Sequence, residues 1–272
     1  MYLEITSPTN PRVKELVALR RRRTRERSDV TLVEGYEELV PALAAGVRPH
    51  TLYYCAELIG ADRQPTVERV AGLGTEVVRL SRQAFDKVAY RESPDGWLAV
   101  VPSLTADLDA LRLGERPLIL ICEGVEKPGN LGAMLRTADA AGVSAVIAAG
   151  PVTDWGNPNL IRASKGTVFS VPVASASSAK VLRWLDERGV AIVATTPDTD
   201  TLFTDVDLTG PTAIAVGAEK HGLSADWLAA AAVKARIPMH GRADSLNVAT
   251  AAAIAVYEAV RQRTGRSQAP RS

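Results

Sequence analysis

Short runs of consecutive apolar residues recur along the second half of the chain, with helix-like segments between them. Strands that are apolar at every position are typical of a parallel sheet covered by helices on both faces. The intervening helices are expected at residues 130–141, 157–167 and 177–188. The pattern therefore predicts an α/β fold with a mainly parallel sheet. Its strands are expected at residues 118–122, 145–149, 190–194 and 212–216.

The first hundred residues also alternate strand-like and helix-like segments, in shorter pieces. Asn10 and Pro11 predict the start of a helix, because Asn accepts hydrogen bonds from first-turn N–H groups and Pro fits the first helical position. Ser81 predicts the start of a second helix, which extends to Val88. The alternation indicates a smaller α/β domain. Strands are expected at 30–33, 51–55, 76–80 and 96–101, and further helices at 39–45 and 66–72.

A polar and acidic stretch separates the two patterns, and Gly114 and Pro117 frame its end. Such a composition is typical of a linker between domains. We therefore predict an N-terminal domain at residues 1–103, a linker at 104–116 and a C-terminal domain at 117–268.

Composition narrows the class of protein. No apolar run approaches the roughly 20 residues that a membrane-spanning helix needs, and the N-terminus lacks the plan of a secretion signal. Cys55 and Cys122 lie far apart, which argues against a disulfide scaffold, and His50, His221 and His240 have no metal-ligand spacing. We therefore expect a cytoplasmic protein without a metal. Its formal net charge is +1, so any attraction to nucleic acid requires a local patch.

A local patch of this kind exists near the N-terminus, where six arginines lie within eight residues. The bland interpretation is a solvated helix end. Arginine binds phosphate through a planar fork, however, and so dense a cluster is repulsive unless an anion offsets it. We therefore favour RNA or DNA contact over a solvated surface. The six residues are Arg20, Arg21, Arg22, Arg23, Arg25 and Arg27.

Polar residues and glycines follow the apolar runs where the predicted strands end. The carboxyl ends of parallel strands meet at one edge of a sheet, which is where α/β proteins bind ligands. Each residue alone is also explained as a turn former or a helix cap, and Asn130 is placed to cap the helix that follows it. The glycines form neither a G-x-G-x-x-G fingerprint nor a phosphate-binding loop, so a dinucleotide-dependent oxidoreductase is a distant interpretation.

Three blocks make the pattern specific. Glu-Lys-Pro-Gly-Asn-Leu-Gly-Ala-Met-Leu-Arg at 126–136, Ala-Val-Gly-Ala-Glu-Lys-His-Gly-Leu-Ser at 215–224 and Ile-Pro-Met-His-Gly-Arg-Ala-Asp-Ser-Leu-Asn at 237–247 closely resemble the motifs of the SpoU (TrmH-type) RNA ribose 2′-O-methyltransferases. The resemblance covers nearly the whole chain. Residues 159–166 resemble a further family element, and residues 10–14 and 33–35 resemble the family's substrate-binding domain.

The resemblance implies a C-terminal domain with a deep trefoil knot, preceded by a smaller L30e-like RNA-binding domain. It implies S-adenosylmethionine as the cofactor, bound against the knotted loops, and a homodimer that completes the active site. The residues expected to meet the cofactor are Thr195, Thr196, Gly217, Ile237, Met239 and Leu246. Residues 240–244 match the family only loosely, and we assign them no role.

The catalytic positions implied by the resemblance are Asn130, Arg136, Glu219, Ser245 and Asn247. Arg136 should lie nearest the ribose hydroxyl. Because an arginine pKa is far above neutral, orientation of the phosphate and ribose suits Arg136 better than the role of a base. Glu219 and Asn130 are expected to position Arg136, while Ser245 and Asn247 hold the motif loops and the cofactor.

The two-domain plan resembles the ribosomal-RNA members of the family, so 23S ribosomal RNA is the expected substrate. A tRNA 2′-O-methyltransferase and a non-catalytic RNA-binding protein of the same fold are the alternatives. Arginine outnumbers lysine, which suggests a GC-rich coding background. Actinomycete members include enzymes that protect their host's ribosome from its own antibiotic, so both a housekeeping and a resistance role stay open.

Overall fold

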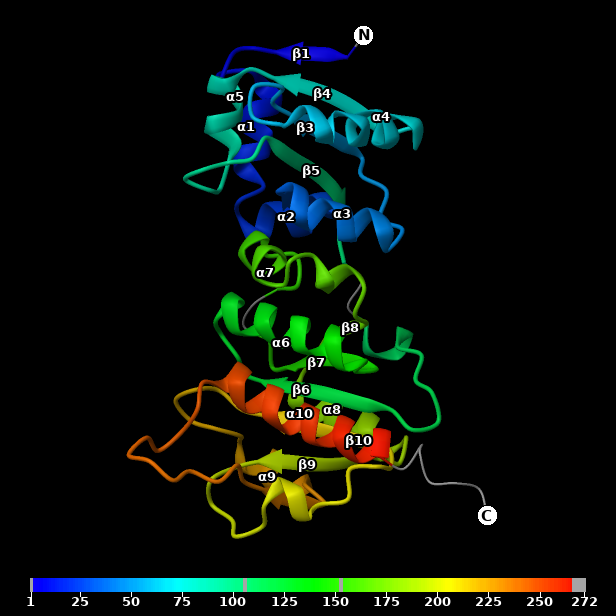
Figure 1. Cartoon of the computed structure of the whole chain (residues 1–272), viewed down its shortest axis with the longest axis vertical. Helices are drawn as coiled ribbons and strands as arrows, with labels where there is room; N and C mark the ends of the chain where they lie inside the picture. Colours follow the sequence, from blue (N-terminus) through cyan, green and yellow to red (C-terminus); the bar gives the residue numbers. More distant parts are fainter. Residues whose placement is uncertain (1, 105–106, 152–153, 266–272) are drawn as a thin grey trace. The chain divides into compact units, whose positions relative to one another are not determined.

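The computed structural model describes residues 2–104, 107–151 and 154–265 (Figure 1). Its residues form two compact units, each described here by itself. Unit 1 contains the described residues up to 104 together with 154–170, and unit 2 contains the remainder. Residues 105–106 of the expected linker and 266–268 of the expected C-terminal domain lie outside the described residues.

Unit 1 contains a five-stranded mixed sheet in the order β1-β4-β3-β5-β2. Strands β1, β4 and β3 are parallel to one another, whereas β5 runs antiparallel to both β3 and β2. The strands are β1 (Leu3–Ile5), β2 (Val30–Glu34), β3 (Thr51–Tyr54), β4 (Glu76–Leu80) and β5 (Trp97–Pro102).

The helices of unit 1 begin largely where the sequence predicts. The Asn10 side chain accepts a hydrogen bond from the Arg12 N–H, and Ser81 accepts one from the Ala84 N–H, so both predicted caps are confirmed. Buried apolar side chains of these helices, including Phe85, pack against the sheet. The α-helices are α1 (Pro11–Ala18), α2 (Arg22–Ser28), α3 (Tyr36–Ala44), α4 (Gln64–Gly72), α5 (Arg82–Val88) and α7 (Pro158–Ala163), with 3-10 turns η1 (Ala61–Arg63) and η3 (Thr167–Phe169).

Segment 154–170 follows the second strand of the C-terminal sheet in the chain, yet it packs with unit 1. Its helix α7 contacts β2, and the Thr31 hydroxyl donates to the Gly156 carbonyl. Gly166 has φ +79°, and a Cβ there would lie 2.8 Å from the Glu38 carbonyl oxygen. The expected helix at 157–167 therefore ends early, because the chain must turn at Gly166 to pack against α3.

Unit 2 contains a six-stranded, fully parallel sheet in the order β11-β9-β10-β6-β7-β8, which confirms the predicted parallel α/β fold. Its edge strands were not predicted, since they are only three and four residues long and partly exposed. The strands are β6 (Leu118–Glu123), β7 (Ala145–Ala149), β8 (Val173–Ala176), β9 (Ala191–Thr195), β10 (Thr212–Val216) and β11 (Val233–Ala235).

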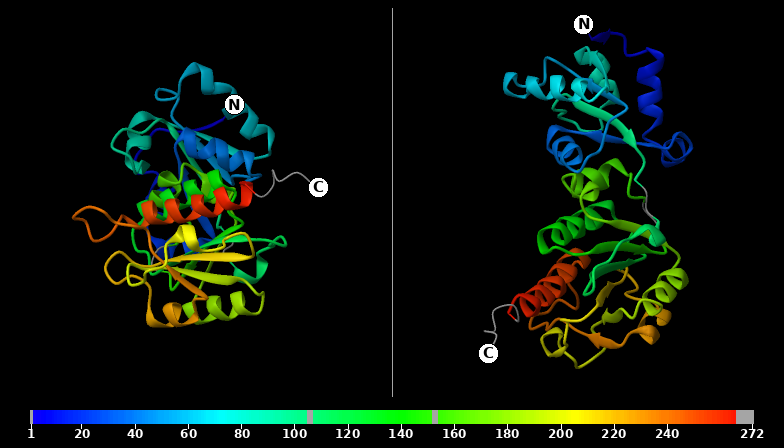
Figure 2. Two further views of the ribbon diagram at one scale, coloured as in Figure 1. Left: turned by 60° about the horizontal axis from the view of Figure 1, so that its bottom comes forward. Right: turned by 90° about the vertical axis from the view of Figure 1, so that its right-hand side faces the viewer.

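Helices cover both faces of this sheet around a core that includes Ile119, Ile147 and Trp227 (Figure 2). Leu108, in the expected linker, is fully buried in the same core. The chain leaves the sheet at the edge strand β11, and its last helix returns to contact α6, β6 and β10, in agreement with the knotted fold expected for this domain. The helices are α6 (Pro128–Ala141), α8 (Ser178–Asp186), α9 (Ala225–Ala230) and α10 (Val248–Gly265), with 3-10 turns η2 (Leu108–Ala110) and η4 (Phe203–Asp205).

Hydrogen bonds from Arg263 hold the last turn of α10 in place. The Arg263 guanidinium donates to the carbonyls of Leu208 at 2.9 Å and Arg116 at 2.8 Å, and also to those of Pro117 and Gly210. These carbonyls lie just before β6 and β10. Arg263 therefore holds the C-terminal end of α10 against the segments that precede these two strands.

Candidate active site

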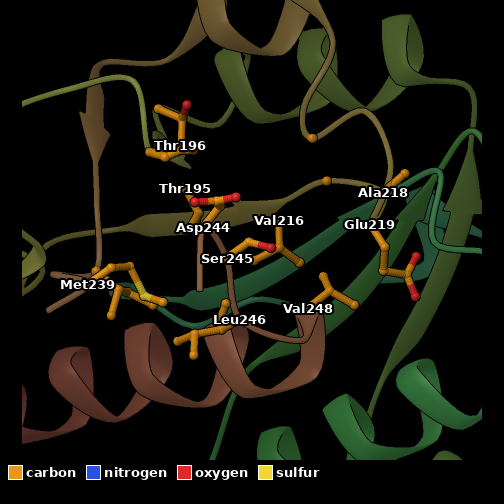
Figure 3. A pocket seen from close by; sticks show the side chains of 15 residues that line it. Thr195, Thr196, Val216, Ala218, Glu219, Met239, Asp244, Ser245, Leu246 and Val248 are labelled. Carbon is orange, nitrogen blue, oxygen red and sulfur yellow. The ribbon is translucent and has the colours of Figure 1, made fainter. Parts of the chain in front are cut away.

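A cavity of about 240 Å³ opens at the carboxyl ends of β9 and β10 (Figure 3). Three segments of unit 2 line it: 195–197 after β9, 216–222 from the end of β10, and 237–251 after β11. The structure brings all six residues expected to meet the cofactor into this one lining. They are Thr195, Thr196, Gly217, Ile237, Met239 and Leu246.

The lining suits a ligand with apolar and polar parts. Val216, Ile237, Leu246 and Val248 give it apolar walls. Within the described part of the chain, the buried Thr195 hydroxyl has no hydrogen-bond partner. A buried hydroxyl left unpaired costs free energy, and a ligand that bonds to it recovers that cost. The residues present therefore fit a mixed apolar and polar cofactor such as S-adenosylmethionine.

The edge strand β11 ends at Ala235. Ile237 and Met239 lie beyond it and line the cavity. Gly217 has a second reason to be a glycine, because a Cβ there would collide with the backbone of Gly222. Its lack of a side chain allows the loop after β10 to fold tightly on itself.

A chain of polar side chains borders the cavity and joins three separate segments. Asn130 Nδ2 donates to Glu219 Oε1, and Asn247 Nδ2 donates to Asn130 Oδ1 at 3.2 Å. Lys127 Nζ lies 3.7 Å from the same Glu219 oxygen. Asn247 Oδ1 also accepts from the Ala249 N–H at 2.9 Å, so Asn247 caps α10 while it bonds Asn130.

This chain corrects the cap expected at Asn130. Helix α6 begins at Pro128, so Asn130 lies inside its first turn, and no side chain caps it at Lys127. A proline at the first helical position removes one of the unpaired N–H groups of the helix start. The Asn130 side chain is therefore free to join Glu219 to Asn247.

Ser245 lines the cavity, so four of the five predicted catalytic residues gather in one place. Arg136 does not. It follows Asn130 by six residues on α6, which corresponds to about 9 Å along the helix axis. Its side chain is exposed and makes no hydrogen bond or ion pair with any other residue that the structure describes.

Two acidic residues at the site were missed from the sequence. Asp244 lines the cavity, although no role was expected for residues 240–244. Glu123, the last residue of β6, accepts hydrogen bonds from the Ser224 N–H and hydroxyl, both at 2.7 Å, and from the Ser178 hydroxyl at 3.3 Å. It thus fixes the far end of the loop after β10. Its position at a strand's carboxyl end was the signal that would have found it.

The six N-terminal arginines are divided by the fold. Arg25 is buried, and its guanidinium donates to the Leu19 and Arg20 carbonyls and to both oxygens of Asp154. Arg20 donates to backbone carbonyls and stacks over Tyr90, 5.0 Å from the ring centre. Arg25 therefore has a structural role and is not available to a phosphate. The members that the fold leaves exposed include Arg21, Arg23 and Arg27.

Comparison with known proteins decides what this site belongs to. Residues 117–257 match the SpoU rRNA Methylase family, and residues 10–99 match the MRM3-like substrate binding domain. The chain belongs to the SpoU rRNA Methylase family. The first match contains the whole cavity lining and every predicted catalytic residue.

Relatives of known activity span both units. The 23S rRNA (uridine(2479)-2′-O)-methyltransferase of Streptomyces viridochromogenes is 34% identical, with 89% of this chain and 86% of the relative covered. The 23S rRNA (guanosine(2553)-2′-O)-methyltransferase RlmP of Bacillus subtilis is 30% identical, covering 93% and 98%. The crystal structure of an AdoMet-bound rRNA methyltransferase from Sinorhizobium meliloti has a TM-score of 0.87 and 33% identity, covering 95% and 97%. No described helix is long and apolar enough to cross a membrane.

Proposed function

We propose that this protein transfers a methyl group from S-adenosylmethionine to a ribose 2′-hydroxyl of 23S ribosomal RNA. The observation that carries the proposal is the convergence of the six cofactor positions on one cavity, bordered by the Asn130–Glu219–Asn247 chain. Relatives that act on ribose 2′-hydroxyls of 23S rRNA cover nearly the whole chain. Because one acts on uridine and another on guanosine, the proposal names the ribose and not the base.

The protein's part in the reaction is mainly alignment. The cofactor supplies a methyl group that its sulfonium has already activated. A ribose hydroxyl is a poor nucleophile near neutral pH, so it must be held in line with the methyl group and must lose its proton. Ser245 lies in the cavity lining on the loop that Asn247 fixes. Through Asn247, this loop is hydrogen-bonded to Asn130 at the start of α6, and Asn130 in turn bonds Glu219 in the loop after β10.

Arg136 is the group we assign to the RNA. Its permanent positive charge and planar fork suit a phosphate next to the reacting ribose. In one chain its side chain stands outside the cavity lining. We therefore propose a homodimer in which Arg136 of one copy serves the cavity of the other. Ile254 and Tyr257 on α10 are large apolar side chains that are 43% and 48% exposed, and this surface supports the dimer.

Mixing two inactive variants tests the shared site. Arg136→Ala keeps the cavity, whereas Leu246→Trp fills it and keeps the arginine. If the site is shared, random heterodimers contain one intact site, and the mixture should recover about a quarter of wild-type methylation. An inactive mixture, with heterodimers present by light scattering and tag pull-down, would show that Arg136 serves its own chain.

We propose that residues 1–103, together with segment 154–170, bind the RNA, and that residues 117–268 otherwise form the methyltransferase domain. Of the expected linker 104–116, residues 107–116 belong to unit 2, where Leu108 is buried in the core. The exposed arginines Arg21, Arg23 and Arg27 are the phosphate-binding members of the N-terminal cluster. Arg20 and Arg22 adjoin them and contribute charge. We further propose that the protein acts in the cytoplasm.

The experiment that tests the function uses total ribosomal RNA and tRNA, each incubated with the full chain and S-adenosylmethionine labelled on the methyl group. Label should appear in 23S rRNA, and sites of 2′-O-methylation should map to one nucleotide that resists alkaline cleavage. Label in tRNA alone would contradict the substrate. Binding of RNA without any transfer of label would favour a non-catalytic RNA-binding protein.

A further inference from the structure

The charge of the cavity lining is one-sided. Two carboxylates, Glu219 and Asp244, belong to the lining, and within the part of the chain that the structure describes it contains no lysine, arginine or histidine (Figure 3). A negative lining favours a cation over a neutral ligand of the same shape. The cavity should therefore distinguish ligands by charge as well as by shape.

The two carboxylates differ in what already holds them. Glu219 accepts a hydrogen bond from Asn130, and Lys127 Nζ lies 3.7 Å from the same oxygen. The Glu219 charge therefore already interacts with Asn130 and Lys127. Asp244 forms no hydrogen bond or ion pair with another described residue. Its charge is available to a ligand in the cavity, and it lies directly before Ser245 in the chain.

The methyl donor and its product differ by one charge. S-adenosylmethionine has a positive sulfonium, and loss of its methyl group leaves S-adenosylhomocysteine with a neutral thioether. The adenosine, ammonium and carboxylate groups are common to both. A negative side chain near the sulfur therefore stabilises the donor and not the product.

We propose that Asp244 is a specificity residue that makes the cavity prefer the charged methyl donor over its neutral product. The inference rests on the proposed function, because it takes this cavity as the cofactor site. It adds a consequence for turnover: transfer of the methyl group removes the attraction, so the product leaves and a new donor replaces it. Because Asp244 is exposed, solvent screens its charge, and the preference it supplies should be about two- to fivefold.

Calorimetric titration of the full chain without RNA tests the proposal. The probes are S-adenosylmethionine, S-adenosylhomocysteine and sinefungin, whose protonated amine replaces the sulfonium. Asp244→Asn removes the charge with little change of shape. Asp226→Asn, an exposed aspartate on α9 outside the lining, makes the same change of net charge and is the matched control.

Asp244→Asn should weaken S-adenosylmethionine and sinefungin about threefold and leave S-adenosylhomocysteine unchanged, while Asp226→Asn alters none of them. Equal weakening of donor and product would place Asp244 at a group that both share, and unchanged affinities would give it no role. Either result overturns the proposal. A wild-type chain that binds none of the three probes would instead contradict the proposed function.

Wild-type protein provides a second measurement that does not depend on the variant folding. Added salt screens an exposed charge, so the ratio of donor to product affinity should fall as the salt concentration rises. Asp244→Glu, which keeps the charge, should retain the wild-type ratio at low salt. A wild-type ratio that does not change with salt would overturn the proposal.

Discussion

In the arginine cluster of unit 1, residues that are neighbours in the sequence are separated in the structure. In the cavity of unit 2, residues that are far apart in the sequence lie together. Six arginines that are adjacent in the chain point to different surroundings, and Arg25 is buried against Asp154 while Arg23 is exposed. Residues 130, 219 and 247 are far apart in the chain and form one hydrogen-bonded group. Consecutive residues of a helix face different directions, whereas the ends of parallel strands share one edge. Strand ends were therefore the better guide to a site.

The largest expected effect separates the two kinds of arginine. Arg25→Ala removes the hydrogen-bonded partner of Asp154 and leaves it only Arg22 Nε, 3.8 Å away. The Arg25 and Asp154 side chains are largely buried, at 5% and 22% exposed. We expect Arg25→Ala to lower the free energy of unfolding by about 3 kcal/mol, the cost of breaking a buried ion pair. Arg23→Ala makes the same change two positions earlier on α2, at an exposed side chain, and should alter the free energy of unfolding by no more than about 0.5 kcal/mol. Urea unfolding measures both, and equal losses would refute the division of the cluster.

The next effect concerns the hydrogen-bonded group. Asn130→Ala removes the hydrogen bonds to both Glu219 and Asn247. The loop after β10 and the loop before α10 are then no longer held to the start of α6. We expect kcat to fall by about 10- to 100-fold, with a much smaller change in S-adenosylmethionine affinity. Asp226→Ala, at an exposed residue of α9 outside the cavity lining, is the control. Loss of cofactor binding with an unchanged kcat would give Asn130 a different role.

A smaller effect is expected at Glu123, whose carboxylate holds Ser224 and Ser178. Glu123→Gln keeps the shape but replaces charge-assisted hydrogen bonds with neutral ones, which are weaker. S-adenosylmethionine binding should weaken about three- to tenfold, because the loop after β10 forms one wall of the cavity. Glu187→Gln, on the surface near α8, should bind normally. Unchanged affinity in Glu123→Gln would show that the loop after β10 keeps its conformation without the Glu123 charge.

The smallest effect is expected for the exposed arginines. Replacing Arg21, Arg23 and Arg27 together by Ala should reduce the slope of log affinity for RNA against log salt by about two to three. The same triple change should leave S-adenosylmethionine binding unaffected, since the cavity lies in unit 2. Filter binding at several salt concentrations measures the slope. An unchanged slope would show that these three arginines are solvated surface residues that do not contact the RNA phosphates.

Much of the fold was predictable because it depends on local patterns. Uniformly apolar runs such as residues 145–149 predicted the parallel strands, and Asn10 and Ser81 predicted helix starts. The pairing of Arg25 with Asp154 was not predictable, since the two are 129 residues apart and the chain between them forms separate strands. Short edge strands such as β8 lack the run of apolar residues that marks a covered strand.

The site divides in the same way. The strand-end pattern indicated the edge of the sheet at which the cavity lies, and the motif resemblance named six residues that line it. The cap expected at Asn130 was wrong, because a sequence does not show whether a polar side chain at a helix start bonds its own backbone or another loop. Arg136 lies outside the cavity lining, which the motif resemblance did not indicate. Asp244 lines the cavity but was passed over, because residues 240–244 match the family only loosely.

Nucleoside analysis of 23S rRNA by mass spectrometry tests the central claim most directly. After incubation with S-adenosylmethionine, wild-type protein should add one 2′-O-methylated nucleoside per rRNA. Leu246→Trp, which fills the cavity, should add none while it retains wild-type thermal unfolding. Methylation that persists in Leu246→Trp, or a methyl group found on a base instead of a ribose, would contradict the account.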